Sequence, residues 1–161
     1  MASKNLLATD DRPAPKARPQ FEYNFPAIRG IQAGRTYFIT MCPLRMIPRL
    51  FLFDEEELPA EMRAQRSLNR ARVPEIARYM TENPENYIFS ALTASVDAEV
   101  TFESLVPEAS GAGERVGTLS IPMEAKFVIN DGQHRRAAIQ QALAENPELG
   151  DETIAIVLFI D

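Results

Sequence analysis

One short stretch of the chain brings together residue types that can hold an anion. From Phe127 to Ile139 the sequence predicts an apolar strand, a tight Asp-Gly turn and the start of a helix that carries two adjacent arginines. The amides of the first helical turn would face outward at the positive end of the helix dipole, where proteins hold phosphate. The residues expected to form this anion site are Asp131, Gly132, Gln133, His134, Arg135 and Arg136.

The members of this turn would contribute in different ways. Gly132 permits backbone angles that are closed to other residues and lets a ligand approach closely. His134 can donate a hydrogen bond, and either of the two arginines can fork onto a pair of oxygens. Asp131 or Asn130 can cap the helix by accepting a bond from an amide two or three residues later. The alternative is purely structural: a capped helix, a histidine packed against the sheet and solvated arginines.

A second set of cations lies upstream, around a helix predicted from about residue 59 to residue 72. Three of these arginines are spaced at i, i+3 and i+7, so they share one helix face. Such a stripe predicts contacts to DNA phosphates. The predicted contacts are Arg63, Arg66, Arg70, Arg72 and Arg78. The alternative is a solvated helix face paired with its acidic neighbours, which are Glu61, Glu75 and the run 54–57.

The charge distribution permits a basic surface although the chain as a whole is acidic, with a formal net charge of −6. Residues 1–80 hold 13 of the 17 Lys and Arg and 9 of the 23 Asp and Glu, a net charge of +4. Residues 81–161 hold the other 4 and 14, a net charge of −10. Attraction to DNA depends on the local patch and not on the total.

Several classes of site are not expected. Cys42 is the only cysteine and His134 the only histidine, so thiolate clusters and histidine-rich metal centres are excluded. A metal nuclease needs several converging carboxylates, and Asp131 has no matched partner. We therefore assign no catalytic residue and no metal ligand. A single cysteine fits a reducing cytoplasm, and no apolar run approaches the roughly 20 residues needed to span a bilayer, so no membrane partner is expected.

The rest of the pattern predicts the elements that position these residues. Strands are expected over residues 21–25, 35–41, 49–53, 87–96, 99–105, 117–121, 126–130 and 153–160. Helices are expected over residues 59–72, 74–82 and 133–145. The run 126–130 is expected to be a buried strand, and the continuous apolar run 153–160 a central one. The fold class is therefore α/β (α+β), a mixed sheet flanked by helices.

Composition divides the chain into two parts. Residues 1–20 combine prolines with mixed charges and few large apolar groups, which predicts a disordered arm. Residues 21–161 predict one domain. Because the sequence stops one residue past a strand that we expect to be central, we expect this domain to be the N-terminal part of a longer protein.

The run from Asn130 to Arg136 resembles the defining motif of the DGQHR-domain family, which includes the DndB proteins of DNA sulfur modification (phosphorothioation). Two further stretches, 70–79 and 86–96, are similar to the same family, and the resemblance spans about residues 21–161. This family is in turn similar to the ParB/sulfiredoxin superfamily, in which a Gly-x-(His/Arg)-Arg turn opens a helix and meets nucleotide phosphates or DNA. The resemblance implies a ParB/sulfiredoxin-like fold with Gly132, His134, Arg135 and Arg136 at an anion site.

The resemblance also implies a function: a cytoplasmic, non-enzymatic DNA-binding regulator that represses the genes of a bacterial phosphorothioation (dnd) cluster. An alternative is a nucleotide-binding switch or nucleotide hydrolase of the same system, with ATP or CTP and magnesium held by the turn Gly132–Arg136. A third is an interaction subunit that docks on other phosphorothioation proteins. Sulfiredoxin chemistry is not expected, because Gln133 stands where those enzymes carry cysteine. Promoter binders are often symmetric, which favours a homo-oligomer.

Overall fold

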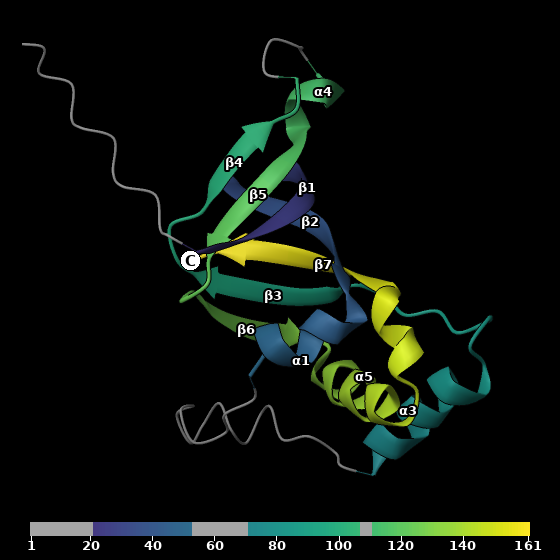
Figure 1. Ribbon diagram of the computed structural model, residues 1–161. Helices are drawn as coiled ribbons and strands as arrows, with labels where there is room; N and C mark the ends of the chain where they lie inside the picture. Colours follow the sequence, from purple (N-terminus) through teal and green to yellow (C-terminus); the bar gives the residue numbers. More distant parts are fainter. Residues whose placement is uncertain (1–20, 53–70, 107–110) are drawn as a thin grey trace, which may run out of the picture.

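The computed structural model describes residues 21–52, 71–106 and 111–161, and within them a seven-stranded mixed sheet carries a group of helices at one end (Figure 1). The strands are β1 (Glu22–Gln32), β2 (Arg35–Pro43), β3 (Leu92–Asp97), β4 (Thr101–Ser104), β5 (Val116–Pro122), β6 (Lys126–Asp131) and β7 (Thr153–Ile160). The helices are α1 (Ile47–Leu50), α3 (Arg72–Glu82), α4 (Ala112–Arg115) and α5 (Gln133–Glu145), with short 3-10 turns at η1 (Leu44–Met46) and η3 (Pro147–Asp151).

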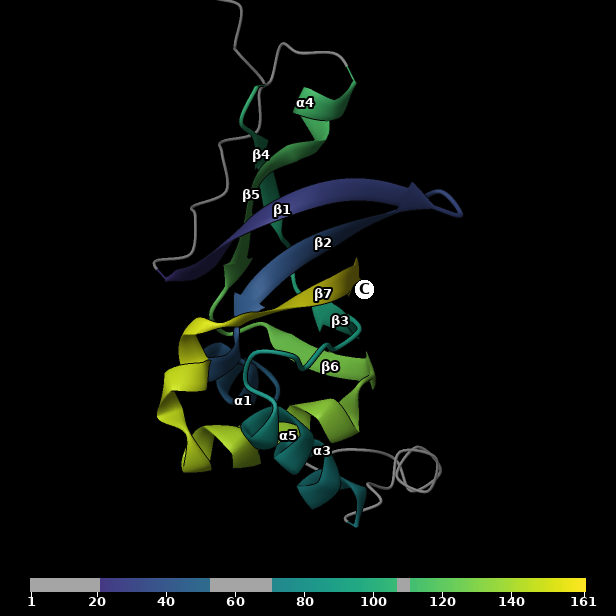
Figure 2. The same cartoon turned by 90° about the vertical axis from the view of Figure 1, so that its right-hand side faces the viewer.

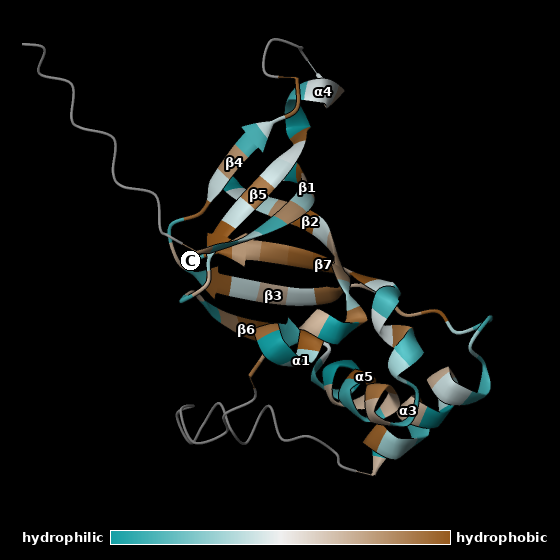
Figure 3. Ribbon diagram, in the orientation of Figure 1, coloured by the Kyte–Doolittle hydropathy of each residue, from teal (hydrophilic) through white to brown (hydrophobic). Residues whose placement is uncertain are grey.

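The strand order is β4-β5-β1-β2-β7-β3-β6, and every pair is antiparallel except β3 with β7. β1 and β2 form a hairpin whose two-residue turn places Ala33 and Gly34 at positive φ, 50° and 75°. Turns of this kind match the twist of the flanking strands. β7 lies between β2 and β3 and is hydrophobic along its whole length (Figure 3), which confirms the predicted central strand.

The core lies on one face of this sheet. Every second side chain of a strand points to the same face, and the buried ones come at that spacing. In β2 they are Phe38, Thr40 and Cys42, and in β7 they are Ile154, Ile156 and Leu158. Thr40 is the one buried polar residue among the described residues, and its hydroxyl donates to the carbonyl oxygen of Pro26 at 2.7 Å. Burial raises the pKa of the Cys42 thiol to about 12.

The sheet is strongly curled. β5 and β6 follow one another in the chain, yet β6 forms one edge of the sheet and β5 lies one strand in from the other. Only three residues connect Pro122 to Lys126, so these two residues lie at most about 15 Å apart even if the connection is fully extended. The two edges must therefore approach each other. Accordingly, the rings of Tyr23 in β1 and Phe127 in β6 meet with centroids 6.3 Å apart, although three strands separate β1 from β6.

α1, α3 and α5 gather where β3 and β7 begin and β6 ends, and both α1 and α3 pack on α5, whereas α4 lies apart beside β4 and β5 (Figures 1 and 2). α5, which packs on α3 and α1, buries small and branched side chains, namely Ala138, Ile139 and Ala142. The predicted bounds of α5 are confirmed. None of the helices in the described residues is long and apolar enough to cross a membrane.

The predicted class, a mixed sheet with flanking helices, is confirmed, but several elements differ from prediction. β6 is an edge strand in which only Ile129 is buried, so the prediction of a buried strand is wrong. The strand predicted over 49–53 is wrong in its described part, because residues 47–50 form the short helix α1 with Pro48 in its first turn. β3 begins at Leu92, five residues later than predicted. The predicted arm 1–20 lies outside the described residues. So does the helix predicted over residues 59–72, apart from its last two positions.

Candidate functional site

The turn from Asp131 to Arg136, hereafter the 131–136 turn, joins the end of β6 to the first turn of α5. Gly132 has φ 111° and ψ 22°, a conformation that L side chains rarely adopt, and this confirms the need for glycine here. A Cβ atom at Gly132 would lie 2.4 Å from Cδ2 of the fully buried Leu92. The first helical bond runs from the amide of Arg136 to the carbonyl oxygen of Gly132 at 2.9 Å.

The prediction that Asp131 or Asn130 caps α5 is wrong, since no side chain makes a capping bond there. Asp131 is still part of the β6 ladder, opposite Thr93, and its exposed carboxylate pairs with the Arg135 guanidinium at 3.4 Å. The side-chain amide of Asn130 donates to the Ser95 hydroxyl at 2.7 Å. The positive end of α5 therefore carries no side-chain cap on its first-turn amides.

Arg135 binds a neighbouring segment of the chain. Its NH1 donates to the carbonyl oxygens of Ser90 at 2.6 Å and Ala91 at 2.9 Å, and to the Ser90 hydroxyl at 2.7 Å. Its side chain is only 16% exposed. These bonds fasten the segment that leads into β3 to the start of α5.

Arg136 fastens α1 to the start of α5 in the same way. Its Nε donates to the carbonyl oxygen of Phe51 at 2.8 Å, and its NH2 to that of Pro48 at 3.4 Å. NH1 donates to the side-chain oxygen of Gln140 at 2.7 Å. Burial lowers the pKa of this guanidinium. Both predicted anion-binding arginines thus donate to carbonyl groups of the protein. An anion at this turn would therefore be bound by the amides of α5 and not by a free guanidinium group.

Gln133 and His134 are half-buried in the first turn of α5. Among the described residues, no group of three or more His, Cys, Asp or Glu side chains is placed to hold a metal ion. The chemistry that the turn offers is that of hydrogen-bond donors at a helix N-terminus, with one carboxylate, Asp131, beside them.

The predicted DNA-contacting arginines are only partly described. Arg63, Arg66 and Arg70 lie outside the described residues, whereas Arg72 and Arg78 are exposed on α3. Neither makes an ion pair with Glu75 or with any other residue that the structure describes. The alternative of a neutralised helix face therefore receives no support from this part of the stripe.

Sequence reasoning missed a third exposed cation, Arg49 in α1. It lies between Pro48 and Phe51, the two residues whose carbonyl oxygens Arg136 holds, and so stands close to the 131–136 turn. Like the α3 arginines, it has no ion-pair partner in the described part of the chain. The signal that could have located it was Pro48, which favours the first turn of a helix over a strand.

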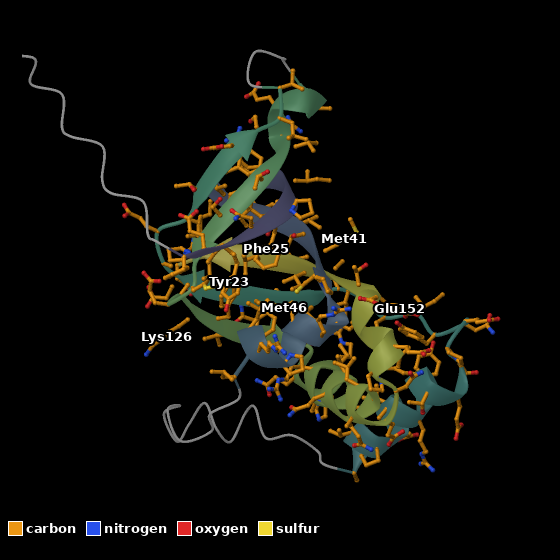
Figure 4. The ribbon with its side chains drawn as sticks, in the orientation of Figure 1. Tyr23, Phe25, Met41, Met46, Lys126 and Glu152 are labelled. Atoms are coloured by element: carbon orange, nitrogen blue, oxygen red, sulfur yellow. The ribbon has the colours of Figure 1, made fainter. Side chains whose placement is uncertain are left out.

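The three residues Arg49, Arg72 and Arg78, hereafter the exposed arginine set, come from the two helices that pack on α5. Other cations lie elsewhere or are paired. Arg45 forms an ion pair with Asp151, and Arg29 lies over the Phe102 ring at 5.0 Å. Lys126 lies at the end of the sheet opposite to the helices (Figure 4). Three of the cations without an ion-pair partner among the described residues therefore lie at the helical end, whereas Arg35, Arg115 and Lys126 lie elsewhere.

Replacing Arg136 with alanine is expected to lower the free energy of unfolding by about 2–3 kcal/mol, because two partly buried carbonyl groups lose a charged donor. Lysine should not restore stability, since an ammonium group cannot reach both carbonyls as the guanidinium does. Urea denaturation measures the effect. Gln140→Ala, which removes only the exposed partner, is the control and should change stability by less than about 0.5 kcal/mol. An unchanged midpoint for Arg136→Ala would show that these bonds are not needed.

Residues 25–161 match the family model DndB, described as DNA-sulfur modification-associated. The matched span contains the 131–136 turn and the exposed arginine set. It also contains the whole sheet apart from the opening residues of β1. No curated protein and no solved structure matches the chain, so the likeness to the ParB/sulfiredoxin fold stays a prediction.

Proposed function

The chain belongs to the DndB family of DNA-sulfur modification-associated proteins, and we propose that it acts in such a system as a DNA-binding repressor of the modification genes. The observation that carries the proposal is the exposed arginine set at the helical end of the molecule. Three guanidiniums without ion-pair partners among the described residues offer donors to phosphate oxygens. The acidic total charge does not oppose this, because the local patch governs the attraction.

Sulfur transfer by this chain itself is not part of the proposal. A cysteine that carries sulfur has to be accessible and ionised. Cys42, the only cysteine in the sequence, is fully buried, and burial raises its pKa to about 12. Binding to DNA, and not chemistry on it, is the role that these residues support.

The test is binding of the protein to duplex DNA from upstream of the modification genes, without nucleotide, measured by fluorescence anisotropy. Three phosphate contacts predict a fall in affinity of about 40-fold between roughly 50 and 200 mM salt. A scrambled duplex of equal length is the control, and a repressor must prefer the upstream sequence. Absence of binding at the lower salt concentration would reject the proposal.

A nucleotide-binding switch remains the second candidate, and one observation favours it. The first-turn amides of α5 have no side-chain cap, and Gly132 lets a ligand come close to them. ATP or CTP with magnesium should then raise the melting temperature, because a ligand of the native state stabilises it. DNA binding without any such shift favours the repressor, and a shift without DNA binding favours the switch.

A further inference from the structure

Among the described residues, no helix packs on one face of the sheet. It is the face opposite to the core, and several of its side chains are large, apolar and solvent-exposed: Ile28 is 52% exposed, Ile39 40%, Met41 58% and Val128 37%. Val157 and Phe159 of β7 lie on the same face, half-buried. We call these six residues the open face.

The pairing of the strands makes the open face continuous across β1, β2 and β7, whereas Thr93 and Ser95 of β3 separate Val128 from it. Ile39 is opposite Ile28 on one side and opposite Val157 on the other. Phe159 is opposite Tyr37, and the two rings stack with centroids 5.6 Å apart. The Tyr37 ring also covers Gly30, where a Cβ would lie 2.7 Å from it. The result is an apolar band across adjacent strands of the sheet.

The same face carries no charge in its interior. Along β1, β2, β7, β3 and β6, the open-face positions between the strand ends hold no Lys, Arg, Asp or Glu. The polar groups there are neutral, and two of them satisfy each other, since Asn130 donates to Ser95. A sheet face in water normally alternates apolar side chains with polar ones on the outside. A phosphate backbone finds no cation in the interior of this face, so DNA is not the partner that we propose for it.

We propose that the open face packs against the open face of a second copy of this chain, forming a symmetric dimer. A neutral apolar surface is complementary to itself, as the isologous interface of a two-fold dimer requires. The three strands that carry the band, β1, β2 and β7, lie about 4.8 Å apart and with some six residues each present roughly 300 Å² per copy. Two copies together bury about 600 Å², the size of a weak, transient contact. Face-to-face sheets pack in this way about 10 Å apart.

The dimer leaves the proposed DNA-binding surface accessible. The exposed arginine set lies on helices at the end of the sheet, whereas the open face lies on the side of the strands away from the core. Two arginine surfaces would then be held by one rigid pair of sheets. This inference does not depend on the repressor function, because self-association is measured without DNA.

The test is sedimentation velocity of the intact chain over about 1–200 μM, a range that covers micromolar dissociation constants. The wild-type protein should sediment as a dimer in the upper part of this range. Ile39→Lys should raise the dissociation constant at least about 30-fold, because it buries an unpaired ammonium group at the centre of the interface. The control is Ile88→Lys, at a residue that is 83% exposed but lies outside the sheet, and it should dimerise like the wild type.

Circular dichroism and the melting temperature establish that the variants are folded. If Ile39→Lys fails to fold, Met41→Glu takes its place, since Met41 is more exposed and lies beside Ala155 on the same face. A wild-type protein that stays monomeric up to about 200 μM overturns the proposal. A dimer that survives folded open-face variants overturns it as well, because a different surface must then be responsible.

Discussion

Replacement of Gly132 with valine is expected to lower the free energy of unfolding by about 4 kcal/mol. The backbone at φ 111° is strained for any L side chain, and most of all for a β-branched one. The new Cβ would also lie within 2.4 Å of Leu92 Cδ2, in a core position that is fully buried. For a chain of this size the melting temperature should fall by about 10 °C or more. Urea and thermal unfolding followed by circular dichroism measure both quantities.

A matched control separates backbone strain from crowding. Gly34, in the β1–β2 turn, also has a positive φ, 75°, but a Cβ there would meet no atom within 4 Å. Gly34→Val should therefore cost only the strain, about 1–2 kcal/mol. Equal losses at the two glycines would show that the contact with Leu92 does not matter, and no loss at Gly132 would show that its backbone conformation is different in solution.

The combined variant Arg49→Ala, Arg72→Ala and Arg78→Ala is expected to weaken DNA binding about 100-fold at roughly 100 mM salt. The slope of log affinity against log salt should fall by about three, one for each lost phosphate contact. Stability should hardly change, because the three side chains are exposed and make no ion pair with a described residue. Anisotropy titrations at several salt concentrations measure affinity and slope together.

Arg35→Ala with Arg115→Ala is the control for a general loss of positive charge. Both residues are exposed but belong to the hairpin and the α4 turn, away from α1 and α3. If this pair reduces affinity as strongly as the triple variant, attraction to DNA is diffuse and the exposed arginine set is not the binding surface. An unchanged salt slope in the triple variant would lead to the same conclusion.

The sequence predicted the parts of the molecule that local rules determine. The bounds of α5 follow from an Asp-Gly break and from apolar residues at helical spacing, and the structure agrees with them. β7 was recognisable as a central strand because a continuous apolar run is typical of such strands, although only one of its two faces is fully buried. The edge position of β6 was not recognisable, since its apolar run has the same composition as a buried strand.

The roles of Arg135 and Arg136 could not be predicted for a different reason. Their acceptors are mainly backbone carbonyl oxygens, 44 to 88 residues earlier in the chain. Every residue has such an oxygen, so no sequence pattern marks the ones that a distant guanidinium will meet. A motif of adjacent cations at a helix start is compatible with ligand binding and with fastening of the fold, and here the structure assigns the guanidiniums to the fold.

The place of β7 has a consequence for how the protein is made. Without residues 153–160 the strands fall into two unconnected groups, β4-β5-β1-β2 and β3-β6, because β7 alone joins β2 to β3. All six of those strands leave the ribosome earlier. Until translation supplies the joining strand, the nascent chain holds two half-sheets with exposed edges, the kind of intermediate that chaperones recognise. The whole sheet can therefore assemble only after β7, the strand that joins its two parts, has been synthesised.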